Sequence, residues 1–558
     1  MLLLACGDTP VETGGPDGGP TDGGPTDGGP TDARLDDAGP TDGSSSPDAQ
    51  PGHDAAEPRP DQGLASDAGI CPPELEAAPG LARTEVGAFQ GAPHRGAWRW
   101  LGIPYAEPPI GERRWRAPEP AACVRTLQPA LEAGPECPQH AGGAIVGDED
   151  CLRLNVFGPV GTADGRSRPV LFFVHGGGHE QGGGARPIYD GASLATRRDA
   201  ILVTFNYRLG PFGFLAHPEL PPPGSNYGMA DQILALEWVR DHIRAFGGDP
   251  DRITILGQSA GAVGVCRLLV SPAARGLFAA AILQSGGCTA APRAQAERAG
   301  RAFLERLGCD DVVCLRGLST QAIMRGFEPL STGTNRVGGG AWGGVVDGAL
   351  LPDAPLALIG RGAWAQVPVV LGTTREENGR DAPELSTAAE YEAAVRALYG
   401  ALYSEAQLER LLAGYPGDAY PSFRAAYVAL TSDRRFTCPT RIHARALSAS
   451  GAPVYRYLFA HLAEGLPPAA RARGVSHSQD LFYVFDRLEL AGLAPGPLDR
   501  QVIDGVQTTW VELERGGPPP TLGWPRYQTP DEQVMVFEDG LRVLPDPKRA
   551  ECDLWQDL

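Results

Sequence analysis

Ser259 stands in a sequence setting in which a serine hydroxyl can act as a nucleophile. It lies in the run Gly-Gln-Ser-Ala-Gly over 257–261, directly after the apolar segment 253–256 and directly before 263–270, whose apolar residues suit a helix. A strand-turn-helix arrangement of this kind strains the turn and lifts the hydroxyl above a sheet, and the glycines allow close backbone packing. An ordinary glycine-rich turn is the alternative for the five-residue pattern alone, and the flanking strand and helix favour a nucleophile.

A serine nucleophile needs hydrogen-bond donors for the negative oxygen that forms when it attacks a carbonyl group. The strand candidate 169–174 runs directly into His-Gly-Gly-Gly over 175–178, and glycines at a strand end let consecutive N–H groups point at one oxygen. We expect Gly177 and Gly178 to supply two donors and the amide of Ala260, the residue after the serine, to supply a third.

The same glycine-rich stretch holds two histidines at a spacing that metal sites use on helices. His175 and His179 are four residues apart. The three glycines between them disfavour a helix, and no acidic motif accompanies them. We therefore predict no metal ion here, and the serine chemistry requires no organic cofactor.

Three histidines are candidates for the base that activates the serine, because enzymes with a serine on such a turn carry the acid and then the histidine later in the chain. His443 falls in a helix-like segment, and His461 immediately follows the strand candidate 454–459. His477 lies in a loop-like segment just before the aromatic run 481–485. We predict His477 as the base, with a surface loop histidine as the alternative.

The acid that orients the base should follow a sheet strand at its carboxyl end, where catalytic groups collect in open α/β sheets. The strand candidate 367–371 is followed by Gly-Thr-Thr-Arg and then by Glu376 and Glu377. The spacing alone does not separate the two glutamates, one of which we expect to be a solvated surface charge.

Short apolar runs alternate with helix-period segments from about residue 80 to the C-terminus, which is typical of an α/β domain. The runs are continuous rather than alternating, as expected for strands of a mostly parallel sheet that helices cover on both faces. Between two of them, 229–246 has apolar residues at helical spacing. We predict a single catalytic domain over 71–558, with strands at 169–174, 201–206, 253–256, 280–284, 367–371 and 454–459.

Residues 1–70 differ sharply from the rest of the chain. They contain no Phe, Trp or Tyr, repeat Gly-Gly-Pro-Thr-Asp three times, and carry 14 Asp and Glu against Arg34 and Arg59. Such a segment cannot bury a core, so we predict that it is disordered. Cys6 follows Met-Leu-Leu-Leu-Ala, which resembles the end of a bacterial lipoprotein signal but is shorter than a secretory signal. A lipid on Cys6 would tether the enzyme to a membrane.

The charge of the chain is concentrated in this segment, which contributes −12 of the total −20 and leaves −8 for the rest. A body of that charge lacks the basic stripes that nucleic acids require, so we expect no nucleic-acid partner. We also predict no protein partner. The 11 cysteines favour an oxidising, extracytoplasmic compartment. We interpret Cys266, which lies in the apolar helix pattern after the serine, as a buried free thiol.

The chain resembles the type-B carboxylesterase and cholinesterase family over nearly all of 80–558. Three stretches carry the resemblance. The first runs from Phe-Gly-Gly-Asp-Pro at 246–250 to the serine motif, the second is Glu-Asp-Cys-Leu-Arg-Leu-Asn-Val at 149–156, and the third is Gly-Ile-Pro-Tyr-Ala at 102–106. The resemblance implies an α/β-hydrolase fold.

The resemblance also implies a role for individual residues. It implies Ser259, Glu377 and His477 as the catalytic triad, with Gly177, Gly178 and Ala260 as the oxyanion hole. Ser285 matches a serine that supports the triad acid. The family's disulfides imply the pairs Cys137–Cys151, Cys309–Cys314 and Cys438–Cys552. Cys71 and Cys123 form a further candidate pair that no family pattern supports.

Two positions depart from the family pattern. Gln258 stands where the family usually has a glutamate before the serine, and this removes a negative charge near the substrate. Asn378 stands where a glycine usually follows the acid. The segment between Cys137 and Cys151 contains no aromatic residue, whereas cholinesterases use a tryptophan there to hold a quaternary ammonium group. A specialist for choline esters is therefore not expected.

The predicted function is hydrolysis of small carboxylic esters by an enzyme that is either secreted or held at the cell envelope through Cys6. One alternative is a lipase that acts on long-chain glycerides. Another is a binding protein that keeps the scaffold without catalysis, but such relatives typically lack a member of the triad.

Overall fold

One large sheet forms the centre of the structure, a computed structural model that describes residues 75–161, 166–328 and 342–558. Its 11 strands are β3 (Ala92–His94), β4 (Ala97–Pro104), β8 (Arg153–Pro159), β9 (Arg168–Val174), β10 (Ile201–Phe205), β11 (Gly248–Gln258), β12 (Ala280–Gln284), β13 (Val369–Thr374), β14 (Val454–Phe459), β15 (Gln533–Glu538) and β16 (Gly540–Pro545).

The strands are ordered β16-β15-β14-β13-β12-β11-β9-β10-β8-β4-β3 across the sheet. All neighbours from β15 to β10 run parallel, and antiparallel strands continue the sheet on both sides. The expected large, mostly parallel sheet is therefore confirmed, and all six strand candidates lie in its parallel part. Shorter sheets contain β1 (Leu81–Thr84), β2 (Gly87–Gln90) and β5 (Leu127–Pro129), and β6 (Gln139–Ala141) with β7 (Ala144–Val146).

Helices pack on both faces of the sheet. The helices of the described residues are α1 (Ala192–Arg198), α2 (Gly210–Phe214), α3 (Tyr227–His242), α4 (Ala260–Val270), α5 (Arg293–Arg306), α6 (Val312–Gly317), α7 (Thr320–Gly326), α8 (Pro355–Gly360), α9 (Ala388–Tyr399), α10 (Glu405–Gly414), α11 (Phe423–Ser432), α12 (Cys438–Ala449), α13 (Pro468–Arg471), α14 (Leu481–Val484), α15 (Pro497–Glu512) and α16 (Arg549–Gln556).

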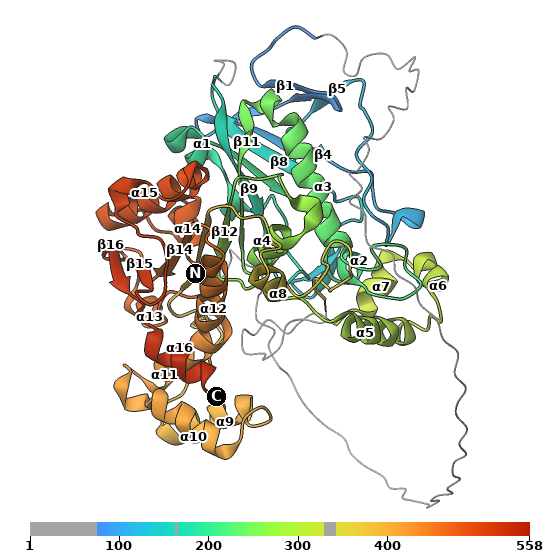
Figure 1. Ribbon diagram of the computed structural model, residues 1–558. Coiled ribbons are helices and arrows are strands. Elements are labelled where there is room, and N and C mark those ends of the chain that lie inside the picture. Colours follow the sequence, from blue (N-terminus) through green and yellow to red (C-terminus); the bar gives the residue numbers. More distant parts are fainter. Residues whose placement is uncertain (1–74, 162–165, 329–341) are drawn as a thin grey trace, which may run out of the picture. The chain divides into compact units, whose positions relative to one another are not determined.

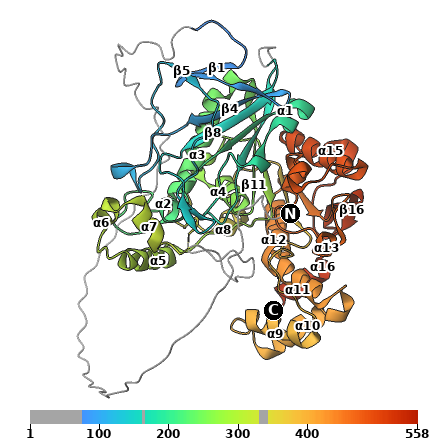
Figure 2. The same ribbon diagram turned by 180° about the vertical axis from the view of Figure 1, so that it is seen from behind.

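Alternate side chains of each central strand enter two different cores. In β9, Val170 and Phe172 pack with residues of α3, α4 and α12. Leu171 and Phe173 point the other way and pack with α1, α14 and α15. Figures 1 and 2 show α3 and α4 on the opposite side of the central strands from α1 and α15. Because both faces are buried, nearly every residue of these strands is apolar, and this explains the continuous runs in the sequence.

A third, smaller core lies away from the sheet among α9, α10, α11 and α16. The end of α11 passes through a π-helical turn, Asp433–Thr437, directly into α12. A disulfide between Cys438 and Cys552 joins the start of α12 to α16. The C-terminal helix is thus covalently attached to the helix that packs on the sheet.

Four disulfides are present among the described residues. Three of them are the pairs that the family resemblance implies, Cys137–Cys151, Cys309–Cys314 and Cys438–Cys552. The fourth joins Cys266 to Cys288, so the interpretation of Cys266 as a free thiol is wrong. The helix pattern placed Cys266 in an apolar interior correctly, but only the packing of α4 beside the end of β12 brings Cys288 within reach.

Cys123 is also disulfide-bonded, and its predicted partner, Cys71, lies outside the described residues, as does Cys6. Within the described ranges, no helix combines the length and the apolar character that crossing a bilayer requires.

Candidate active site

Ser259 occupies a strained turn between β11 and α4. Its backbone has φ 58° and ψ −126°, a conformation that side chains with a Cβ rarely adopt. The Ser259 N–H donates to the Gln284 carbonyl at the end of β12 (2.8 Å), and the Ser259 carbonyl accepts from Val263 in the first turn of α4 (3.1 Å). Ser259 itself is half-buried. The turn is therefore held on both sides while the serine keeps access to solvent.

The glycine loop after β9 lies beside this serine. A Cβ added to Gly176 would lie 3.1 Å from Ser259 Cβ, and one added to Gly177 would lie 2.0 Å from the Gln181 carbonyl oxygen. Gly177 and Gly178 have φ 110° and 68°, which a side chain would oppose. The loop can approach the serine this closely because its residues lack side chains.

Glu377 and His477 are joined by a short hydrogen bond of 2.5 Å between Glu377 Oε2 and His477 Nδ1. The Glu377 side chain is fully buried, and that of His477 is 18% exposed. Oε1 of Glu377 accepts from the Thr374 amide at the end of β13 (2.9 Å). Glu376 instead receives hydrogen bonds from Arg375 Nε (2.7 Å) and the Val475 amide (2.8 Å). Of the two glutamates, only Glu377 contacts the predicted base.

The other ring nitrogen of His477 faces the serine turn. Gln258 Nε2 lies 3.1 Å from His477 Nε2. With Nδ1–H donated to Glu377, Nε2 carries a lone pair that accepts this bond. Because Gln258 immediately precedes Ser259, the contact brings the imidazole to the turn that carries the hydroxyl. Sequence reasoning noted Gln258 only as a lost negative charge and missed this contact.

Residues in and next to the π-helical turn between α11 and α12 contact the chain around Glu377 and His477. Phe436 packs on the His477 ring with 5.0 Å between centroids, and Ser432 Oγ accepts from the Asn378 amide (3.1 Å), directly after the acid. Turns of this kind often occur at functional sites. The sequence shows no periodic signal for such a turn, and neither contact was predicted.

The two alternative histidines lie elsewhere. His443, on α12, accepts from the Cys288 amide (3.3 Å), and burial lowers its pKa to about 4. His461 is fully enclosed and pairs with Asp499 (2.8 Å). Neither contacts the turn at Ser259.

Ser285 is buried at the end of β12, next to the residue that accepts from Ser259. Its Oγ has no hydrogen-bond partner among the described residues, so its support of the acid stays a prediction. Gln284 donates through Nε2 to Asp480 (2.7 Å). Burial raises the pKa of Asp480 to about 6, which places an unpredicted titratable carboxyl three residues after the base.

The rings of His175 and His179 contact different side chains. His175 stacks on Tyr207 with 4.4 Å between ring centroids. His179 Nε2 lies 3.2 Å from Nη1 of Arg267, on α4. Burial lowers the pKa of both imidazoles, that of His175 to about 4, so both are neutral at pH 7.

The chain is similar to known carboxylesterases. The model of the carboxylesterase family matches residues 79–555. The para-nitrobenzyl esterase of Bacillus subtilis (strain 168) is 33% identical over 485 residues, which cover 84% of this chain and 96% of that protein. The fumonisin B1 esterase of Sphingopyxis macrogoltabida is 33% identical over 495 residues, 83% of this chain and 88% of that enzyme.

A solved structure of a PNB esterase superposes with a TM-score of 0.72 at 32% identity and covers 85% of this chain and 99% of its own. The family match spans the sheet, the serine turn and the Glu377–His477 pair. The chain therefore belongs to the carboxylesterase family and is a carboxylic ester hydrolase with an α/β-hydrolase fold.

Proposed function

We propose that the enzyme hydrolyses small esters through an acyl-enzyme on Ser259. His477 takes the proton from Ser259 Oγ as the oxygen attacks the ester carbonyl, and Glu377 holds the tautomer in which Nδ1 carries a proton. The alcohol leaves with the proton that His477 returns. Water then repeats the sequence on the acyl-enzyme, activated by the same imidazole.

The observation that supports this proposal most is the orientation of His477 between two fixed points. Nδ1 is bound to a fully buried carboxylate at 2.5 Å, and Nε2 faces the turn that carries Ser259 through its contact with Gln258. The imidazole is thus oriented with Nε2 toward the serine turn, and the Gln258 amide must release Nε2, which has one lone pair, before this nitrogen accepts the serine proton.

The amides of Gly177, Gly178 and Ala260 act as the oxyanion hole in this proposal. Gly177 and Gly178 belong to the loop beside Ser259, and Ala260 begins α4. The positive end of the α4 dipole adds to the stabilisation of a negative oxygen. Loss of one such donor typically costs about 2.7–4 kcal/mol in the transition state.

Hydrolysis of p-nitrophenyl butyrate by the full chain, produced in an oxidising host, tests the mechanism. Ser259→Ala should lower kcat by roughly a million-fold, by analogy with other serine hydrolases. Glu377→Gln should lower kcat by about 10⁴-fold, whereas Glu376→Gln, its matched control one residue away, should change it by less than about threefold. Equal effects of the two glutamine variants would reject Glu377 as the acid.

An emulsified long-chain triglyceride separates the proposal from the lipase alternative. A higher kcat/KM on the triglyceride than on p-nitrophenyl butyrate would favour a lipase. The absence of turnover on both by correctly folded protein would favour the binding-protein alternative.

The location of the enzyme is the remaining part of the proposal. The four disulfides are consistent with an extracytoplasmic protein, and we infer attachment through a lipid on Cys6. Mass spectrometry of the protein from its native host should find a diacylglycerol thioether at Cys6, and an unmodified Cys6 in exported protein would reject the tether.

A further inference from the structure

Arg267 is a buried cation two turns into the helix that begins beside the nucleophile. Arg267 is only 4% exposed. Nε donates to the Thr289 carbonyl (3.0 Å), and Nη1 contacts the neutral His179 ring (3.2 Å). Among the residues that the structure describes, none supplies a carboxylate to this guanidinium. Burial lowers the pKa of Arg267 only to about 10, so it is charged at pH 7.

The other buried arginines of the described ranges are all paired. Seven arginines are buried, and every one except Arg267 forms an ion pair with a carboxylate. The six pairs involve Arg114 with Glu149, Arg168 with Asp199, Arg208 with Asp231, Arg441 with Glu532, Arg456 with Asp546, and Arg487 with Asp190.

An unpaired buried charge destabilises a protein, because the charge has lost its hydration and gained no partner. A chain that supplies a carboxylate to its other buried arginines and not to this one has left a cationic position open. Exceptions of this kind are expected at functional sites. The planar guanidinium is suited to bidentate hydrogen bonds with a carboxylate.

The position of Arg267 connects it to the reaction centre. His179, which it contacts, follows Gly178 directly in the glycine loop beside Ser259. On α4, residues 260, 263 and 267 lie on one face, and Val263 is the one residue of this helix that is not buried. The face that carries Arg267 is therefore incompletely buried at Val263, one turn closer to the proposed oxyanion hole.

Two glycines that lie close to Arg267 leave room for its guanidinium group. A Cβ added to Gly344 would lie 2.4 Å from Arg267 Nε, and one added to Gly343 would lie 3.5 Å from Nη2. The absence of side chains at these two positions lets the arginine lie in this interior position.

We propose that Arg267 binds a carboxylate of the substrate, so that the enzyme prefers esters with a free carboxylate near the scissile bond, such as half-esters of dicarboxylic acids. This inference deepens the proposed function and rests on it. The substrate anion supplies the counter-ion that the protein does not, and the binding energy positions the ester carbonyl at Ser259.

The test compares methyl hydrogen glutarate with methyl pentanoate, a neutral ester of similar size, using the full chain at constant ionic strength in a pH-stat. The unmodified enzyme should have a kcat/KM at least about tenfold higher for the half-ester. Arg267→Met should lower kcat/KM for the half-ester at least about tenfold more than kcat/KM for methyl pentanoate, which removes the preference. Arg267→Lys should retain part of the preference, and Arg298→Met, on the exposed surface of α5, controls for net charge and should retain all of it.

Two outcomes would overturn the proposal. One is the absence of any preference in the unmodified enzyme. The other is an equal loss on both esters in Arg267→Met, which would mean that the arginine positions His179 and the glycine loop instead of the substrate.

A binding measurement separates failure of this inference from failure of the proposed function. Sodium glutarate should raise the Tm of Ser259→Ala and should not raise that of Ser259→Ala/Arg267→Met, with sodium chloride of equal ionic strength as the control. This result supports the carboxylate site even if neither ester is hydrolysed. Equal shifts in the two variants, or none, would reject the site whatever the activity.

Discussion

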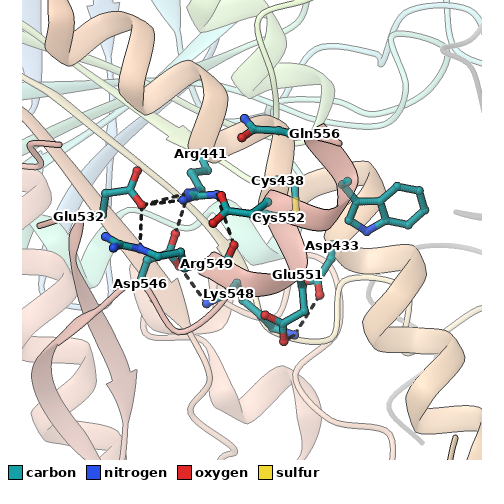
Figure 3. Close-up of a disulfide and its surroundings, with 12 residues drawn as sticks. Asp433, Cys438, Arg441, Glu532, Asp546, Lys548, Arg549, Glu551, Cys552 and Gln556 are labelled. Carbon is teal, nitrogen blue, oxygen red and sulfur yellow. Dashed lines mark hydrogen bonds and ion pairs between the residues drawn. A yellow bond between two sulfur atoms is a disulfide. The ribbon is translucent and has the colours of Figure 1, made fainter. Parts of the chain in front are cut away.

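Arg441 and Arg267 are both buried arginines that lie close to a disulfide, but their electrostatic surroundings are opposite. Arg441, on α12, follows Cys438 by three residues and pairs with Glu532 (2.8 Å), Asp546 (3.3 Å) and Asp553 (2.6 Å). Figure 3 shows this cluster around the Cys438–Cys552 disulfide. Arg267 directly follows Cys266, and within the described part of the chain its hydrogen-bond partners are a carbonyl and a neutral imidazole.

Arg441 therefore belongs to a structural cluster of charges, whereas we propose that the charge of Arg267 binds a ligand. Around Arg441, Lys548 also pairs with Asp433 (3.0 Å), at the start of the π-helical turn whose Phe436 packs on His477. The charges of the cluster around Arg441 are balanced within the protein, so this cluster holds α16, α12 and the turn together. Arg267 has no such balance within the described residues, and it lies next to the loop that borders the nucleophile.

The largest losses of stability in the two regions should come from removing their disulfides. Cys438 and Cys552 are separated by 114 residues, and Cys266 and Cys288 by 22. Because a longer closed loop restricts the unfolded chain more, replacing the first pair with serines should lower the free energy of unfolding by about 4–5 kcal/mol and the second by about 3 kcal/mol. Guanidinium denaturation of the two double variants measures both values. The reverse order would contradict the loop-closure explanation.

Replacing each of the two arginines with methionine should lower the stability by different amounts. Arg441→Met leaves Glu532 and Asp546 buried with fewer partners, and we expect a loss of about 3–5 kcal/mol. Arg267→Met leaves no described carboxylate unpaired, and the Thr289 carbonyl that it releases belongs to an exposed residue. We expect a loss below about 1 kcal/mol, or a gain. Urea unfolding of both variants checks this, and a loss from Arg267→Met as large as that from Arg441→Met would show that Arg267 is a structural charge.

The ion pair between Lys548 and Asp433 should show strong coupling. Each of Lys548→Met and Asp433→Asn removes one partner of a buried pair, so the double variant should be more stable than the sum of the single losses implies, by about 1–3 kcal/mol. The variants should also lower kcat on p-nitrophenyl butyrate, because the π-helical turn contacts His477. Additive losses with unchanged kcat would mean that the cluster does not support the active site.

Acid should weaken the Arg441 cluster selectively. Burial favours the neutral form of Glu532, but hydrogen bonds from Arg445 and Arg441 prevail and lower its pKa to about 2. A carboxyl with a lowered folded-state pKa contributes stability above its unfolded pKa of about 4.3 and loses it as the pH falls. The stability of the unmodified protein should therefore fall between about pH 4.5 and pH 2, and that of Glu532→Gln should fall less. Parallel curves from pH-dependent unfolding would contradict this assignment.

Features formed by residues close together in the chain were predictable from the sequence. The six central strands are continuous apolar runs because both sheet faces are buried, and all six lie in the parallel part of the sheet. The strands β3, β4, β8, β15 and β16 of the same sheet were not predicted. In β4 the burial varies along the strand, and β16 is largely exposed or half-buried, so neither produces a continuous apolar run.

The chain also determined the serine turn and the glycine loop, because a strained turn and a donor loop need particular small residues at adjacent positions. Tertiary structure decided which of two neighbouring glutamates faces His477, since that depends on how the chain turns after β13. It also decided that Cys266 pairs with Cys288 and that Arg267 has no described carboxylate beside it. A charged residue within an apolar helix pattern was visible in the sequence, but its partners come from segments distant in the chain, and only their packing in space determines whether that charge is balanced.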